Sequence, residues 1–161
     1  MSDVPEVFSL LAELALALAG FSGVAAAFSG RDRSYRPTEY IRLISLFHTS
    51  GTVFVCSGFV YVFHLAEFSP SQTFRTASLL VTVIFASVGI PFTIKAYRAA
   101  QAPDSSSEAW ALHLNSFWIC LVLGLTGINI VFGQLYLLLA SLWLIMTYGI
   151  WMFFRFLTRA N

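Results

Sequence analysis

The sequence predicts an all-α protein, a polytopic transmembrane bundle of five helices that forms one domain over residues 1–161. Three observations predict this fold class. The composition is 58% hydrophobic and 11% charged, whereas soluble domains are about 45–50% apolar and about 25% charged. Apolar runs recur at the length that crosses a bilayer, about 20 residues for a helix. Basic residues gather on one side of those runs, as they do in membrane proteins.

The first three spans are separate apolar runs with prolines at their edges. Their expected bounds are about 7–28, 43–65 and 77–96. Pro5, Pro37, Pro70 and Pro103 fall before the first span or in the connections between spans. A missing backbone N–H is tolerated at such positions, because they lie outside the interior of a helix. The proline pattern therefore agrees with the apolar runs.

The last apolar stretch covers about 112–157 and is too long for one span. Gly133 and Gln134 interrupt it. They divide it into two expected spans, at about 112–132 and 135–157. The segment 101–108 before this stretch has the sequence QAPDSSSE and is expected to be a polar cytoplasmic linker.

Charge orients the spans, because cytoplasmic loops carry the excess of Lys and Arg. With five spans, Arg75 lies on one side and the other eight of the nine basic residues lie opposite. These eight are Arg31, Arg33, Arg36, Arg42, Lys95, Arg98, Arg155 and Arg159. A single long last span would weaken the split to six against three. The sequence therefore predicts five helices with the N-terminus outside and the C-terminus inside.

Glu13 is the residue of this sequence that most strongly indicates a function. It lies about 12 Å into the first span at about 1.5 Å per residue, and a carboxylate at such depth normally faces a bundle interior or water. Glu6, Glu13, Gly20 and Ala27 recur every seven residues and so share one helix face. Because acidic rings select cations, this face predicts a cation path in an oligomer. The alternative is a protonated or hydrogen-bonded Glu13 that fixes a helix contact.

Glycines predict two faces for close helix packing. Gly20 and Gly23 lie on the first span, and Gly51 and Gly58 lie on the second. Small residues allow the backbones of transmembrane helices to approach closely. We therefore expect the small face of the second helix to dock on that of the first.

His64 is a candidate pH-sensing residue. Ser50, Ser57 and His64 recur at heptad spacing on the second span, which would place His64 at the outer end, near Glu6 and Glu67. A histidine among carboxylates titrates near neutral pH. The alternative is an interfacial histidine with a water partner.

Polar residues also share one side of the fourth span. Asn115, Thr126 and Asn129 fall there, with Val122 between them, and Asn129 is deep enough to need a partner. Interhelical hydrogen bonds are one explanation. The other is a polar translocation path shared with Glu13, which would lie in the same outer half of the membrane.

Nothing in the sequence indicates an enzyme, a cofactor or a metal site. No nucleophile–base pair, paired-carboxylate motif or metal-ligand spacing is present. His48 and His113 both lie toward the expected inner side, which raises a bis-histidine haem, but no other haem-binding signature accompanies them. A net charge of +1 without a basic cluster among aromatic residues argues against nucleic-acid binding.

Three sequence features resemble small, functionally unassigned bacterial inner-membrane proteins. These are AGFSGVAAAF followed by an arginine-rich loop (19–36), FRTAS at the start of the third span (74–78), and the aromatic-rich FFRFL (153–157). The resemblance implies a five-helix architecture and a multi-pass location in the bacterial inner membrane. It implies no activity and no site residues.

Two functional hypotheses follow, and both place the chain in a lipid bilayer. The first is a homo-oligomeric, cation-preferring channel or pore. Its path would run between subunits, with Glu6 and Glu13 at the mouth, Gly20 further in, and Asn129 as a further candidate. The second is a non-catalytic structural or interaction subunit that binds another membrane protein, with Glu13 as an assembly contact.

Overall fold

The computed structural model describes residues 4–29, 37–100 and 109–158, and all regular structure within them is helical. The helices are α1 (Val4–Ser29), α2 (Pro37–Leu65), α3 (Pro70–Ala100), α4 (Ala109–Phe132) and α5 (Leu135–Leu157). Each contains a segment long and apolar enough to span a membrane. The expected all-α class with five helices long and apolar enough to span a membrane is thus confirmed, and it supports a multi-pass membrane protein. The expected linker 101–108 lies outside the described residues.

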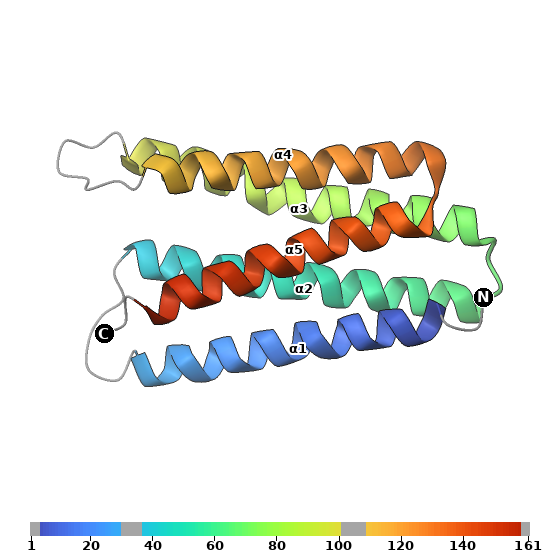
Figure 1. The fold of residues 1–161 in the computed structure, drawn as a ribbon, viewed down its shortest axis with the longest axis horizontal. Helices are drawn as coiled ribbons and strands as arrows, with labels where there is room; N and C mark the ends of the chain where they lie inside the picture. The colour runs from blue at the N-terminus through green and yellow to red at the C-terminus, as the bar shows by residue number, and fades with distance from the viewer. Residues whose placement is uncertain (1–3, 30–36, 101–108, 159–161) are drawn as a thin grey trace.

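Successive helices alternate in direction, so α1 begins at one end of the bundle and α5 ends at the other (Figure 1). Helices α2 and α5 occupy the centre: each contacts the other, and both contact α1 and α3. Helix α4 packs on α3 and α5. Within the described residues, α1 contacts α2 and α5 and no other helix. One long side of α1 therefore remains uncovered by the described parts of the chain.

The described basic residues divide between the two ends of the bundle. Lys95 and Arg98 lie in the last turns of α3, and Arg155 lies near the end of α5. Because α3 and α5 run in the same direction, these three residues share one end, whereas Arg75 near the start of α3 lies at the other. This arrangement fits the predicted orientation, with the C-terminal end of α5 inside, which stays a prediction.

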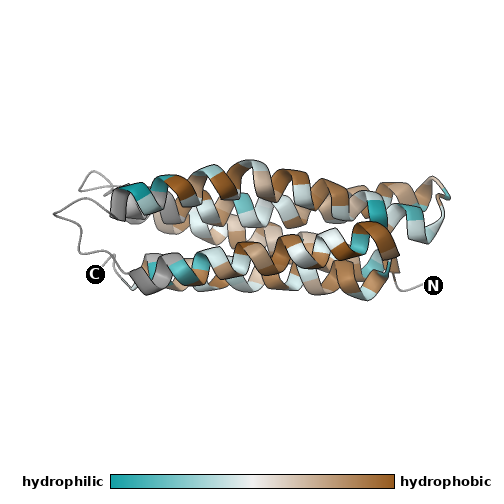
Figure 2. Cartoon of the chain, turned by 90° about the horizontal axis from the view of Figure 1, so that it is seen from above, coloured by the Kyte–Doolittle hydropathy of each residue, from teal (hydrophilic) through white to brown (hydrophobic). Residues whose placement is uncertain are grey.

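Apolar side chains cover the middle of the bundle as well as filling it. Hydrophobic residues dominate the length of the helices, and hydrophilic residues increase toward the ends (Figure 2). Large apolar side chains such as Leu10, Val83, Val131 and Trp143 are more than half exposed. In water so much apolar surface would be a strong liability. A lipid environment removes that cost, because acyl chains are as apolar as these side chains.

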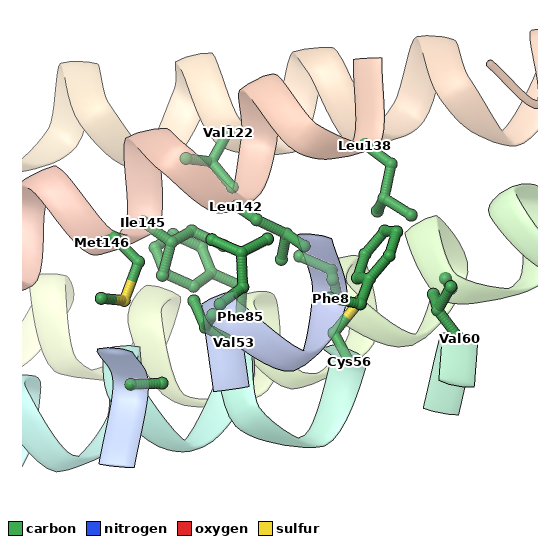
Figure 3. Close-up of a cluster of buried hydrophobic side chains, with 14 of the residues drawn as sticks. Phe8, Val53, Cys56, Val60, Phe85, Val122, Leu138, Leu142, Ile145 and Met146 are labelled. Atoms are coloured by element: carbon green, nitrogen blue, oxygen red, sulfur yellow. The ribbon is translucent and has the colours of Figure 1, made fainter. Parts of the chain in front are cut away.

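The core is built from interlocking side chains of all five helices (Figure 3). Phe8 of α1 lies beside Cys56 and Val60 of α2, and Leu138 and Leu142 of α5 close the space above them. These five side chains are at most 1–2% exposed. The centre of a single chain is therefore tightly filled with apolar groups.

The α4–α5 turn depends on Gly133, which has φ +63°. L-amino acids with a Cβ adopt this left-handed region at a cost. A Cβ at Gly133 would also lie 2.6 Å from Ser71 Oγ and 2.7 Å from the Ser71 carbonyl oxygen at the start of α3. Glycine is thus required both by the backbone conformation and by the contact. This explains why the long apolar stretch is divided at Gly133 and Gln134, as the sequence predicts.

Candidate functional site

The outer face of α1, defined here by Glu6, Glu13, Gly20 and Ala27, points away from the bundle. All four side-chain positions are exposed. The opposite face of α1 is buried and comprises Phe8, Leu11, Ala15, Leu18 and Ser22. The seven-residue spacing therefore does mark one side of the helix, and that side has no neighbour within the described chain.

Glu13 is thus an exposed carboxyl group inside a segment that can span a membrane, Val4–Ala27. A charged side chain at the centre of a spanning helix costs about 2.5–3.5 kcal/mol on insertion scales. Such groups normally face a protein interior or a water-filled cavity, where they find hydrogen-bond partners. The described part of the chain gives Glu13 neither environment.

Asn129 lies in a different part of the molecule and has a clear structural role. It is fully buried, and its amide nitrogen donates to Ser78 Oγ of α3 over 2.8 Å. Its side-chain oxygen accepts from the backbone N–H of Gln134 over 2.6 Å. Asn129 therefore joins α3 to α4 and satisfies a free N–H at the start of α5.

Within one chain, Asn129 and Glu13 do not lie on a shared path, and the contacts of Asn129 are the interhelical hydrogen bonds that the sequence offered as the other explanation. Helix α1 does not contact α4 within the described residues, because α2 and α5 lie between them (Figure 1). Glu13 faces outward, whereas Asn129 faces α3. Sequence spacing places residues on a face of their own helix, but it does not show which neighbour that face meets.

The remaining polar residues of α4 are satisfied by hydrogen bonds to neighbouring helices. Thr126 is fully buried and accepts a hydrogen bond from Thr82 Oγ1 over 2.8 Å. Asn115 donates from Nδ2 to Thr93 Oγ1 over 3.0 Å. The shared face that the sequence predicts is therefore present, and it serves interhelical hydrogen bonding.

A small cavity with a mainly apolar surface lies between α2, α3, α4 and α5, near the ends expected to be cytoplasmic. Its polar lining includes Ser45, His48 and Thr49 of α2, with Asn115 of α4 and Tyr148 of α5. Phe85 forms part of the α3 wall, and its ring stacks on the His48 ring with centroids 5.6 Å apart.

A chain of hydrogen bonds runs along one wall of this cavity. The Tyr148 hydroxyl donates to Asn115 Oδ1, and Asn115 in turn donates to Thr93. The His48 Nε2 atom is buried and has no hydrogen-bond partner among the described residues. Sequence analysis missed this cluster. The available signal was Tyr148, a hydroxyl group in the middle of an apolar span that needs a polar partner.

His64 lies at the end of α2 and is exposed. It lines a small pocket with mainly apolar neighbours, among them Val4 of α1 and Phe74 of α3. Its backbone carbonyl accepts from the N–H of Glu67, which has φ +57°. Within the described chain, no hydrogen bond or ion pair joins the His64 side chain to a carboxylate. The pH-sensing role of His64 stays a prediction.

Close packing occurs at a glycine different from those predicted. A Cβ added at Gly20, Gly51 or Gly58 would meet no atom within 4 Å, and one at Gly23 would meet Phe47 at 3.9 Å. These glycines do not form the expected tight contact between α1 and α2. Gly149 of α5 does form a tight contact, because its added Cβ would lie 2.8 Å from Thr49 Oγ1 and 3.1 Å from Leu18 Cδ2.

The histidines have separate surroundings. His113 is exposed, and its Nδ1 lies 3.2 Å from the Tyr97 hydroxyl, whereas His48 faces the cavity between four helices. Within the described chain, no group of three or more His, Cys, Asp or Glu side chains could hold a metal ion. Cys56 is buried, and Cys120 is exposed.

The fold is a five-helix bundle in which each helix is long and apolar enough to cross a membrane, and its first helix has an exposed carboxyl group, Glu13, within the candidate spanning segment. No family model, curated protein or solved structure matches the chain. Its function must therefore be argued from its own residues.

Proposed function

We propose that the chain is an integral membrane protein whose copies assemble through the outer face of α1 and enclose a cation path between them. Glu13 and Glu6 would line the outer part of that path, with Gly20 further in. One observation carries the proposal: Glu13 is an exposed carboxyl group within a spanning segment, on the side of α1 opposite to the face that packs on the bundle. The bacterial inner membrane and an external N-terminus are part of the same proposal.

Assembly provides Glu13 with surroundings that the single chain lacks. A carboxylate facing acyl chains is costly, and a water-filled path between copies would remove that cost. An acidic ring along such a path would favour cations over anions. Asn129 is not included, because it faces α3 rather than α1.

A path through a single chain is not supported. The centre of the bundle is occupied by Phe8, Val53, Leu142 and Ile145, each fully buried. These side chains belong to α1, α2 and α5, so they close the space between the central helices (Figure 3). Conduction between copies requires no opening of this core.

Gly20 supports close approach of a second copy. It is exposed, and a Cβ there would meet nothing within 4 Å, so another helix can approach the α1 backbone at this level. Small residues at exposed positions of spanning helices favour such contacts. Gly20 and Glu13 lie on the same face, so one interface would include both.

The second candidate is a non-catalytic subunit of a membrane complex. The same exposed carboxyl group supports it, because a polar or basic group on another membrane protein would satisfy Glu13 as well as water would. The two candidates differ in the partner that covers α1: a copy of the chain for the channel, and a different protein for the subunit.

Cation flux into proteoliposomes tests the channel directly. We expect flux with the wild-type protein and loss of flux in Glu13→Gln, which keeps the size of the side chain and removes its charge. Glu67→Gln is the matched control, since Glu67 is also exposed but lies in the turn between α2 and α3. Absence of flux above empty liposomes, across voltage and pH, would refute conduction.

Cysteine cross-linking in the membrane separates assembly from conduction. We expect Gly20→Cys to form a disulfide-linked dimer in a background without Cys56 and Cys120. Leu79→Cys is the control, because Leu79 is exposed on α3, far from the proposed interface. Cross-linking without flux would favour a structural homo-oligomer. No cross-linking, together with co-purification of another membrane protein that depends on Glu13, would favour the subunit.

A further inference from the structure

We propose that the cavity between α2, α3, α4 and α5 binds a single water molecule that contacts His48 Nε2. This water would connect His48 to the Tyr148–Asn115–Thr93 hydrogen-bond chain. The inference is independent of the proposed function, because no residue of the outer α1 face lines the cavity.

The size of the cavity selects the ligand. Its volume is about 20 Å³, and a cavity of about 10–15 Å³ by this measure holds one water molecule. A larger organic ligand would have to displace the surrounding side chains. The wall is mainly apolar, with Phe85, Phe92 and Ile119 among its residues, and His48 and Asn115 belong to the few polar residues of the lining.

The polar residues of the lining supply the partners that a buried water molecule needs. Such a molecule makes about two to four hydrogen bonds. The His48 Nε2 atom is buried without a partner in the described part of the chain. Asn115 Oδ1 accepts from Tyr148 and, as a carbonyl oxygen, has a second lone pair. The proposed water accepts from the Nε2–H of His48 and donates to Asn115 Oδ1.

The arrangement of elements makes this site a junction between helices. His48 belongs to α2, Thr93 to α3, Asn115 to α4 and Tyr148 to α5. Direct hydrogen bonds join α3, α4 and α5 here, while His48 is held by stacking on Phe85. A bound water would extend the polar connection to α2.

The unpartnered nitrogen is the decisive observation. Buried polar atoms in native proteins almost always have a hydrogen-bond partner, which is often an ordered water molecule. Ser50 and Ser57 also have buried hydroxyls without a partner among the described residues, but neither lines this cavity. Of these three residues, only His48 both has an unpartnered buried polar atom and lines this cavity, which is large enough for a water molecule.

Hydroxyl-radical footprinting of the purified, full-length protein tests the site, with water as the probe. Brief radiolysis converts bound water to radicals that oxidise adjacent side chains, even buried ones. We expect oxidation of Tyr148 and Phe85 beside the cavity. Phe8 is the internal control, because it is buried and lines neither this cavity nor the pocket beside His64. Equal labelling of Tyr148, Phe85 and Phe8 would overturn the proposal.

Gly89→Ala links the signal to the cavity. Gly89 lines the cavity, and its added Cβ would lie 3.5 Å from Ile119 Cδ1, an ordinary contact that fills space without a clash. We expect Tyr148 oxidation in this variant to fall to the level of Phe8. Gly124→Ala, which meets no atom within 4 Å, should leave it unchanged. Unchanged oxidation in folded Gly89→Ala would refute the site.

A second measurement identifies the nitrogen. In protein with ¹⁵N-labelled histidine and with His64 and His113 replaced by Gln, we expect magnetisation transfer between water and the Nε2–H of His48. Gly89→Ala should abolish this transfer while the helical circular dichroism is retained. Absence of transfer in the parent protein would show that water does not contact His48.

Discussion

The crossing of α5 with α2 and α1 at Gly149 is expected to limit the stability of the bundle. Gly149 is buried, and an added Cβ would lie 2.8 Å from Thr49 Oγ1 and 3.1 Å from Leu18 Cδ2. Thr49 Oγ1 also donates to the Leu46 carbonyl over 2.9 Å, so moving it breaks a hydrogen bond. Gly149→Ala must therefore separate the helices or rearrange Thr49.

The magnitude follows from the two opposing effects of the substitution. Overpacking a close contact costs about 1–3 kcal/mol, whereas Gly→Ala in a helix gains up to about 1 kcal/mol of propensity. Gly124→Ala is the control for the second effect, because it is helical and its Cβ meets nothing within 4 Å. We expect the free energy of unfolding of Gly149→Ala to be about 1–3 kcal/mol below that of Gly124→Ala.

Reversible unfolding by SDS in mixed micelles, followed by circular dichroism, measures these free energies. Thr49→Ala removes the contacting oxygen, so the double variant should recover part of the loss in a double-mutant cycle. The same free energy of unfolding for Gly149→Ala and Gly124→Ala would refute the close crossing. Strictly additive effects of Gly149→Ala and Thr49→Ala would refute the role of Thr49.

Two further predictions concern the α4–α5 turn and use the same unfolding assay. Asn129→Ala removes the hydrogen bonds to Ser78 and to the Gln134 N–H, so we expect the free energy of unfolding to fall by about 1–2 kcal/mol. A fall no larger than that caused by Ser78→Ala would contradict a role for the hydrogen bond between Asn129 and the Gln134 N–H. Gly133→Ala places a Cβ on a left-handed backbone and within 3.0 Å of Ser71 atoms, so we expect the free energy of unfolding to fall by about 2–5 kcal/mol. A variant as stable as the wild type would exclude this turn geometry.

The five spans could be predicted because the signals that define them are local. In a bilayer every backbone polar group must be satisfied within the segment, so a long apolar run forms a helix whatever its neighbours are. Gly133 and Gln134 divided the last stretch correctly, and the helix that follows begins at Leu135. The seven-residue spacing on α1 also placed Glu6, Glu13, Gly20 and Ala27 on one side of the helix.

The neighbours of each face could not be predicted in the same way. A path shared by Asn129 and Glu13 was one of two explanations for the polar face of α4, but within one chain Asn129 faces α3 and Glu13 faces outward. Gly51 and Gly58 have the small size that packing requires, yet the close contact forms at Gly149. Spacing along one helix contains no information about which helix comes alongside it.

The sequence by itself determined the class of this protein: five apolar helices, their order and the turn at Gly133. Tertiary structure decided which helices meet: among the described residues, α1 contacts α2 and α5, and its outer face is uncovered. It also decided that polar side chains of α4 form hydrogen bonds with α3, and that His48 and Tyr148 line the same cavity. The physical reason is the range of the interactions. Helix formation in an apolar solvent is fixed within about 20 consecutive residues, whereas helix pairing depends on side-chain packing and hydrogen bonds between distant segments.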